Sequence, residues 1–139
     1  MEQNFSDPLS AAVAKRNSNV LETVKNALKY GRTALAFQPV IQAGAPQNVV
    51  YYEGLVRIID PAGRHIPARD FIAQVENNEL GRLIDCATLQ LGLATLAEQP
   101  DVRLFVNMSA QSIGYPNGCA RLKRVFKGHR IWQQISFWK

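Results

Sequence analysis

Charged residues in one apolar stretch raise the first question about chemistry. The segment VVYYEGLVRIID (49–60) is rich in Val, Tyr and Ile, which favours a β-strand, yet it contains Glu53 and Arg57. Side chains alternate between the two faces of a strand, so these two residues point to the same side. A carboxylate can ligate a hard cation, and a guanidinium suits a phosphate group. The structural alternative is an ion pair on the strand.

Two amides occupy similar positions in other apolar stretches. Gln38 lies within ALAFQPVIQ (34–42), and Asn107 lies within VRLFVNMS (102–109), flanked by Val106 and Met108. A polar group on a buried strand costs free energy unless it is hydrogen-bonded or binds something. Asn107 is therefore either a satisfied core amide or part of a site.

The elements that position these residues follow from periodicity and breakers. We expect strands at 34–42, 49–60 and 102–109, and helices at 8–16, about 19–31, from near Pro67, and 79–99. Strands separated by helical segments predict an α/β architecture.

Four motifs in order resemble one family. FQPV (37–40), YEGLVR (52–57), ARDFIAQVENN (68–78) and VNMS (106–109) are similar to the motifs of the EAL domain, the bacterial phosphodiesterase of cyclic di-GMP. The resemblance covers about residues 19–116, roughly the first half of such a domain. It implies an incomplete TIM-type (β/α)8 barrel, comprising the first three strands and N-terminal helices. Active sites of these barrels lie at the C-terminal ends of the strands.

The resemblance also implies roles for individual residues. Glu53 and Asn107 would ligate a catalytic Mg or Mn ion, for which oxygen ligands are suitable. Gln38, Leu55 and Arg57 would contact cyclic di-GMP, with Arg57 at a phosphate. The signature of the family has Ala where this chain has Gly54, whose position faces away from Glu53.

Several parts of a complete site are absent from the sequence. A barrel of this type needs roughly 250 residues, whereas the chain has 139, and the later motifs of the family are missing. Two ligands do not make a two-metal centre. We therefore expect the chain to be inactive alone as a cyclic di-GMP-specific phosphodiesterase. The alternatives are a degenerate cyclic di-GMP-binding module and a protein-interaction module. Exposed strand edges would favour self-association.

The last residues differ in composition from the rest. Residues 121–139 contain six Lys or Arg and no Asp or Glu. Read one base out of frame, Phe137–Trp138–Lys139 forces Leu-Glu, which resembles the end of the next strand of the family. We predict three regions, namely N-terminal helices (1–33), a truncated EAL domain (34–116) and an out-of-frame tail (117–139).

Composition narrows the location and the partners. No apolar run approaches the roughly 20 residues of a membrane span, and the N-terminus lacks the pattern of a signal peptide. We therefore expect a cytoplasmic protein without membrane contact. The net charge of +5 comes from residues 121–139, and residues 1–120 carry a net charge of −1. A frameshift would make this basic charge accidental, so we expect no nucleic-acid partner.

Overall fold

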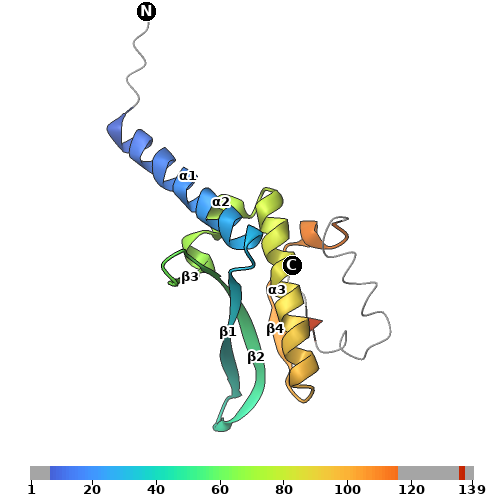
Figure 1. Cartoon of the computed structure of the whole chain (residues 1–139). Coiled ribbons are helices and arrows are strands. Elements are labelled where there is room, and N and C mark those ends of the chain that lie inside the picture. Colours follow the sequence, from blue (N-terminus) through green and yellow to red (C-terminus); the bar gives the residue numbers. More distant parts are fainter. Residues whose placement is uncertain (1–6, 116–134, 137–139) are drawn as a thin grey trace, which may run out of the picture.

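The computed structural model describes residues 7–115 and 135–136. Two short 3-10 turns, η1 (Ala68–Asp70) and η2 (Ala110–Ser112), accompany the helices and strands (Figure 1). The helices and strands are α1 (Pro8–Lys29), β1 (Thr33–Gln42), β2 (Ala45–Ile59), β3 (His65–Pro67), α2 (Ile72–Val75), α3 (Glu79–Glu98), β4 (Leu104–Val106) and β5 (Ile135–Ser136).

A single long helix opens the described chain. The side chain of Asp7 caps α1 by accepting a hydrogen bond from the backbone nitrogen of Leu9 at 3.3 Å, and Pro8 occupies the first helical position. The sequence predicted two helices here, and that prediction is wrong. The segment Asn17–Ser18–Asn19 contains weak helix formers but neither Pro nor Gly, so nothing forces a break.

The sheet is open and partly antiparallel. Its strand order is β1–β2–β4–β5. The short strand β3 pairs with the end of β2, on the edge of β2 that faces away from β1. β1 runs antiparallel to β2, whereas β2, β4 and β5 are mutually parallel. The sheet is therefore mixed, whereas the strands of a TIM-type barrel would all be parallel. β1 and β2 are antiparallel because only Ala43 and Gly44 join them. A parallel pair would need a crossover of a dozen or more residues.

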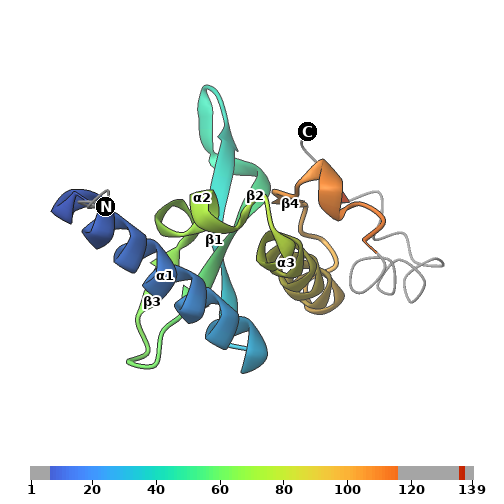
Figure 2. The same ribbon diagram turned by 90° about the horizontal axis from the view of Figure 1, so that it is seen from above.

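The helices cover one face of this sheet. Val24 and Ala27 of α1 pack with Val56 and Ile58 of β2, in a cluster that also contains Phe71, Val75 and Ile84. Leu89, Leu93 and Leu96 of α3 pack with Leu104, Val106 and Met108 in a second cluster. Figure 2 shows α1 and α3 beside each other along this face of the sheet. The core therefore lies between the helices and the sheet.

The segment between β3 and α3 is less helical than predicted. The stretch from Pro67 folds as η1 followed by the single turn α2, although Phe71 and Val75 are buried as their spacing indicates. The prediction of a long helix at 79–99 is confirmed by α3, whose first turn is capped by the side chain of Asn78. None of the helices in the described ranges is long and apolar enough to cross a membrane.

Candidate metal and phosphate site

Alternate residues of β2 have different surroundings. Gly54, Val56 and Ile58 are buried against the helices. Glu53, Leu55 and Arg57 are only partly buried and lie on the opposite face of the strand. One face of β2 therefore builds the core, and the other is available for ligands.

Two predicted metal ligands meet on this open face. The Nδ2 atom of Asn107 donates a hydrogen bond to Oε1 of Glu53 at 2.8 Å. Asn107 directly follows β4, whose residue Phe105 is the parallel partner of Glu53. The end of β4 thus brings an amide from 54 positions away to the carboxylate.

Gln38 reaches the same place from the other neighbouring strand. It is the antiparallel partner of Glu53 in β1, and directly opposed residues project from the same face of a sheet. β1, β2 and β4 therefore place three of the predicted site residues on one face. The side chain of Gln38 is exposed to solvent.

Arg57 lies further along the same face. Its Nη1 atom donates to the backbone oxygen of Val56 at 3.0 Å and to that of Leu55 at 3.5 Å. Four residues of extended chain separate it from Glu53 by about 13 Å. Within the described part of the chain, the ion pairs are Arg64–Asp60 and Arg69–Asp70, so the alternative of a Glu53–Arg57 pair is wrong.

A cavity of about 540 Å³ borders Asn107 and Leu55. It lies between β2, the α2–α3 region and the segment that follows β4. Its polar lining includes Glu76, Asn77, Asp85, Ser109 and Gln111. The cavity is also lined by Gly54 and Val56 of the buried face of β2, so it contacts the predicted site only at Leu55 and Asn107.

Asp85 organises this region and was missed by the sequence analysis. Its Oδ2 atom accepts hydrogen bonds from the Ser109 backbone nitrogen at 2.9 Å and from the Ser112 hydroxyl at 2.6 Å. Burial raises the pKa of Asp85, and these two hydrogen bonds partly oppose the shift. The available signal was a carboxylate beside Ile84 on the apolar side of a predicted helix.

Other residues of α3 hold the same segment. Arg82 donates to Oε1 of Gln111 at 2.9 Å, and its guanidinium lies 5.9 Å from the ring centre of Tyr115. The hydroxyl of Tyr115 donates to the carboxylate of Glu79. One helix therefore fixes the chain from Ser109 to Tyr115, immediately after Asn107.

The donor set suits a hard cation in part. Glu53 and Asn107 offer a carboxylate and an amide oxygen, which Mg²⁺ and Mn²⁺ accept. The amide nitrogen faces Glu53, so the Asn107 amide must rotate before its oxygen can join the carboxylate at a cation. No cluster of three His, Cys, Asp or Glu side chains suited to a metal occurs among residues 7–115 and 135–136.

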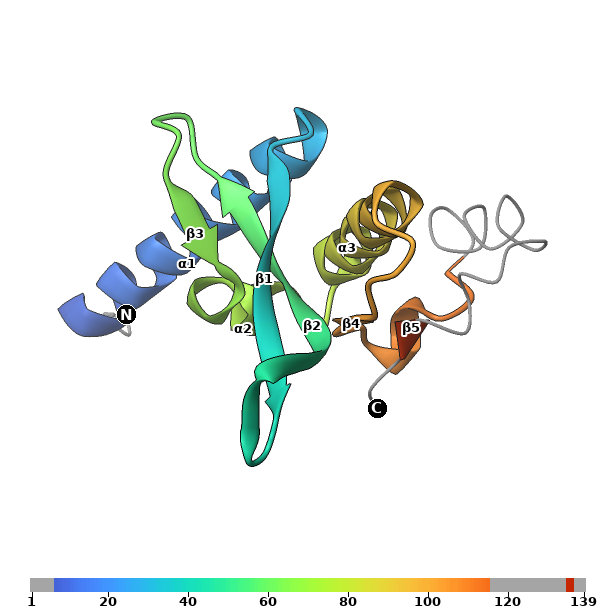
Figure 3. The same cartoon turned by 90° about the horizontal axis from the view of Figure 1, so that it is seen from below.

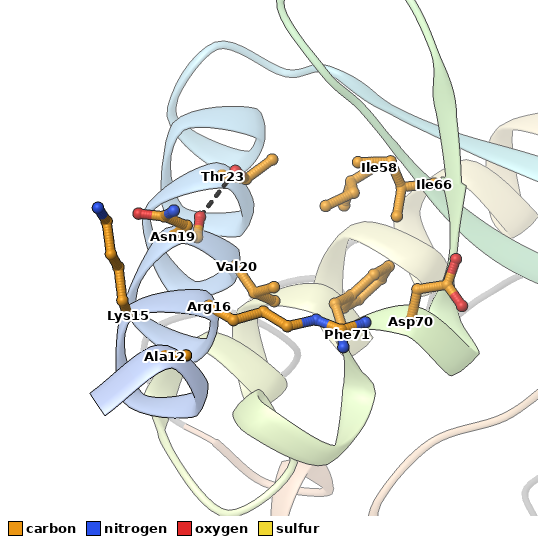
Figure 4. Close-up of a pocket in the computed structure, with 10 residues that line it drawn as sticks. All are labelled: Ala12, Lys15, Arg16, Asn19, Val20, Thr23, Ile58, Ile66, Asp70 and Phe71. Carbon is orange, nitrogen blue, oxygen red and sulfur yellow. Dashed lines mark hydrogen bonds between the residues drawn. The ribbon is translucent and has the colours of Figure 1, made fainter. Parts of the chain in front are cut away.

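A second cavity lies on the helix-covered face, away from Glu53. Its volume is about 420 Å³, and Ile58, Ile66 and Phe71 form its apolar wall. Figure 4 shows Arg16 of α1 extending across it towards Asp70. Ile58 belongs to the buried face of β2, so this cavity is separate from the predicted site.

Comparison with known proteins gives a consistent assignment. The family model described as "EAL domain" matches residues 21–137. Comparison with curated proteins found no match.

Among solved structures, the FimX EAL domain from Pseudomonas aeruginosa bound to c-di-GMP is similar, with 26% identity and a TM-score of 0.66 over 86% of this chain and 49% of that one. The Xanthomonas citri FimX EAL domain in complex with c-diGMP has 18% identity and a TM-score of 0.69, covering 91% and 51%. The PaMucR phosphodiesterase in complex with c-di-GMP has 20% identity and a TM-score of 0.57, covering 86% and 50%. This chain spans about half the length of each.

Proposed function

The chain belongs to the EAL-domain family, and from this membership we propose that it carries one half of a cyclic di-GMP phosphodiesterase site. In this proposal Glu53 and Asn107 are ligands of a Mg or Mn ion. Gln38, Leu55 and Arg57 contact the dinucleotide. The observation that carries the proposal is the 2.8 Å contact between Asn107 and Glu53, made where β4 ends.

The role proposed for each residue follows from the chemistry of its side chain. A bound cation would polarise the phosphoryl oxygen of the substrate or activate a water molecule. Glu53 and Asn107 lie on adjacent strands, and rotation of the Asn107 amide would turn its oxygen towards a cation held by the carboxylate. Arg57 supplies a permanent positive charge for a phosphate. Within residues 7–115 its guanidinium donates to the backbone oxygens of Leu55 and Val56, and a phosphate could replace these acceptors.

We propose further that the chain does not hydrolyse cyclic di-GMP alone. Two-metal hydrolysis needs ligands on both sides of the scissile phosphate, and the described residues contribute one carboxylate and one amide on this face. The missing ligands would have to come from another polypeptide segment.

A turnover assay tests this proposal. The purified chain is incubated with cyclic di-GMP and Mn²⁺, and the linear dinucleotide is measured by chromatography. We expect no product above that of Glu53→Ala. Turnover by the wild-type chain that Glu53→Ala abolishes would show that it is a complete enzyme, and the half-site proposal would fail.

The second candidate function is binding of cyclic di-GMP without hydrolysis. It is supported by the FimX EAL domain from Pseudomonas aeruginosa, which was solved bound to c-di-GMP and is 26% identical to this chain. Calorimetric titration of the chain with cyclic di-GMP distinguishes this candidate. Heat that is lost in Arg57→Ala supports a binding module, whereas the absence of heat at high micromolar ligand removes it.

The tail from about residue 117 is a separate question. We propose that this tail is read out of frame, because it contains no Asp or Glu and a reading shifted by one base yields Leu-Glu at its end. The family match extends to residue 137 and includes most of this segment, whose residues 116–134 and 137–139 lie outside the described structure. The sequence of the coding DNA tests the frameshift proposal. If restoring one base does not open a frame with the later EAL motifs, the frameshift proposal is wrong.

A further inference from the structure

The cavity beside α1 has the size and composition of a small-molecule site. α1 crosses the sheet beside β2 and β3 (Figure 3), and the cavity of about 420 Å³ lies between these elements and η1. Ligand pockets are typically cavities of roughly 300–1,000 Å³ with mostly apolar walls and a few polar groups. This cavity lies on the helix-covered face of the sheet, so a ligand here would not depend on the half-site around Glu53.

The wall of the cavity is apolar and comes from four parts of the chain. Val20 of α1, Ile58 of β2, Ile66 of β3 and Phe71 after η1 all line it (Figure 4). Ile58 and Phe71 are each 1% exposed and belong to the core cluster, so the wall is continuous with the core. An apolar group in the cavity would therefore be removed from water on several sides.

Two cations also line the cavity. Lys15 and Arg16 come from α1, and Figure 4 shows Arg16 extending across the cavity. In the part of the chain that the structure describes, neither of them makes an ion pair. Asp70 is the acidic residue of the lining, and its Oδ1 atom lies 3.7 Å from Nε of Arg69. The local balance is thus two cations without an ion pair against one carboxylate that already has a basic partner.

We propose that this cavity binds a small amphipathic carboxylate. The apolar body of the ligand lies against Val20, Ile66 and Phe71, and its carboxylate accepts hydrogen bonds from the guanidinium of Arg16. The planar guanidinium matches a carboxylate with two parallel hydrogen bonds. The exposed Lys15 adds a second positive charge on the same side of the cavity.

The charges of the lining favour a carboxylate over other small ligands. A cationic amphiphile would meet Lys15 and Arg16 and would have to compete with Arg69 for Asp70. A neutral apolar molecule would fit the wall but would gain nothing from the guanidinium. Inorganic phosphate would meet the cations but has no group to place against the apolar wall.

Titration of the full chain with three matched probes tests the proposal. Sodium octanoate, 1-octanol and octylammonium carry the same alkyl chain and differ in the charge of the head group. Binding is followed by calorimetry and by the backbone amide signals in NMR spectra. We expect saturable shifts for octanoate in residues 12–23 and 66–71, with clearly weaker binding of 1-octanol and the weakest binding of octylammonium.

Three variants on exposed positions separate the head-group contact from general charge. Arg16→Gln should weaken octanoate binding about fivefold or more and leave 1-octanol unchanged, because only the head-group contact is lost. Asp70→Asn should tighten octanoate binding, since it removes a negative charge from the lining. Lys25→Gln is the matched control, because Lys25 is an exposed cation of α1 that does not line the cavity, and this variant should bind octanoate like the wild type.

Several results would overturn the proposal. They are the absence of saturable shifts with millimolar octanoate, shifts outside the two cavity segments only, and binding of 1-octanol or octylammonium as tight as that of octanoate. Equal weakening by Arg16→Gln and Lys25→Gln, or weaker octanoate binding in Asp70→Asn, also overturns it. These substitutions leave the core intact, and circular dichroism of each variant verifies that it is folded.

Discussion

The two faces of β2 have different roles, since one packs in the core and the other carries the candidate site residues. On one face Gly54, Val56 and Ile58 are buried by the helices, and each contributes to packing. On the other face Glu53 and Arg57 are partly exposed, and their contacts are hydrogen bonds to an amide and to backbone oxygens. A shift by one residue along the strand thus changes the expected effect of a mutation from stability to ligand binding.

The largest effect should come from the buried face. Ile58→Ala removes a side chain that is 1% exposed, and we expect a loss of about 2–5 kcal/mol in the free energy of unfolding. Leu55→Ala on the partly buried face should cost clearly less. Urea denaturation followed by circular dichroism measures both. Equal losses would mean that the two faces are not distinct.

The hydrogen-bonding role of Asp85 should give the next largest effect. Asp85→Ala leaves the fully buried hydroxyl of Ser112 without this acceptor, and we expect a loss of about 1–3 kcal/mol. A double-mutant cycle with Ser112→Ala isolates the interaction, because the cost of Asp85→Ala should shrink when the hydroxyl is already absent. Strictly additive losses in urea denaturation would contradict the role assigned to Asp85.

The acid dependence of stability should distinguish two carboxylates with opposite shifts. The pKa of Asp60 is lowered by a hydrogen bond from the backbone of Arg64, with further help from the Arg64 side chain and from Ala62. Its stabilisation is therefore present above the ordinary Asp pKa and is lost as pH falls through the lowered value. The raised pKa of Asp85 has the opposite consequence, since its contribution is lost as pH rises.

Variants allow these two contributions to be separated. Asp60→Asn should remove part of the acid-side loss of stability, and Asp85→Asn should remove part of the loss on raising pH. Unfolding free energies measured from pH 3 to pH 7 provide the comparison with the wild type. A pH dependence unchanged in both variants would contradict the assigned shifts.

The smallest effect should follow restoration of the usual residue of the family signature. In Gly54→Ala the new Cβ would lie 3.3 Å from Cγ1 of Val106 and 3.4 Å from Cδ1 of Leu104. The neighbouring side chains must move by a few tenths of an ångström, so we expect a change of less than about 1.5 kcal/mol. The Asn107–Glu53 hydrogen bond lies on the other face and should persist, which the side-chain amide signals in an NMR spectrum report.

Local patterns predicted some elements better than others. The long helix at 79–99 was predicted within one residue because its apolar repeat and flanking signals agree. The direction of β1 was not predicted, since periodicity identifies a strand but not its orientation. The continuity of α1 was missed because the weak helix formers Asn17, Ser18 and Asn19 lie inside a helix that tertiary packing extends.

The candidate site was predictable to the extent that its residues lie in motifs. Gln38, Glu53 and Asn107 were selected from three separated stretches, and the strand register places them on one face. Asp85 was missed because a single carboxylate on a helix has no motif of its own. Its role depends on the path of the chain after β4, which brings Ser109 and Ser112 to it and which sequence spacing does not encode.

Complementation tests the half-site most directly. The chain is mixed with a polypeptide that contains the C-terminal half of an EAL domain, and cyclic di-GMP turnover is measured in Mn²⁺. We predict no turnover by either half alone, turnover in the mixture, and its loss when this chain carries Glu53→Ala. A mixture without turnover, or turnover that persists with Glu53→Ala, would contradict the proposal that Glu53 belongs to a metal site.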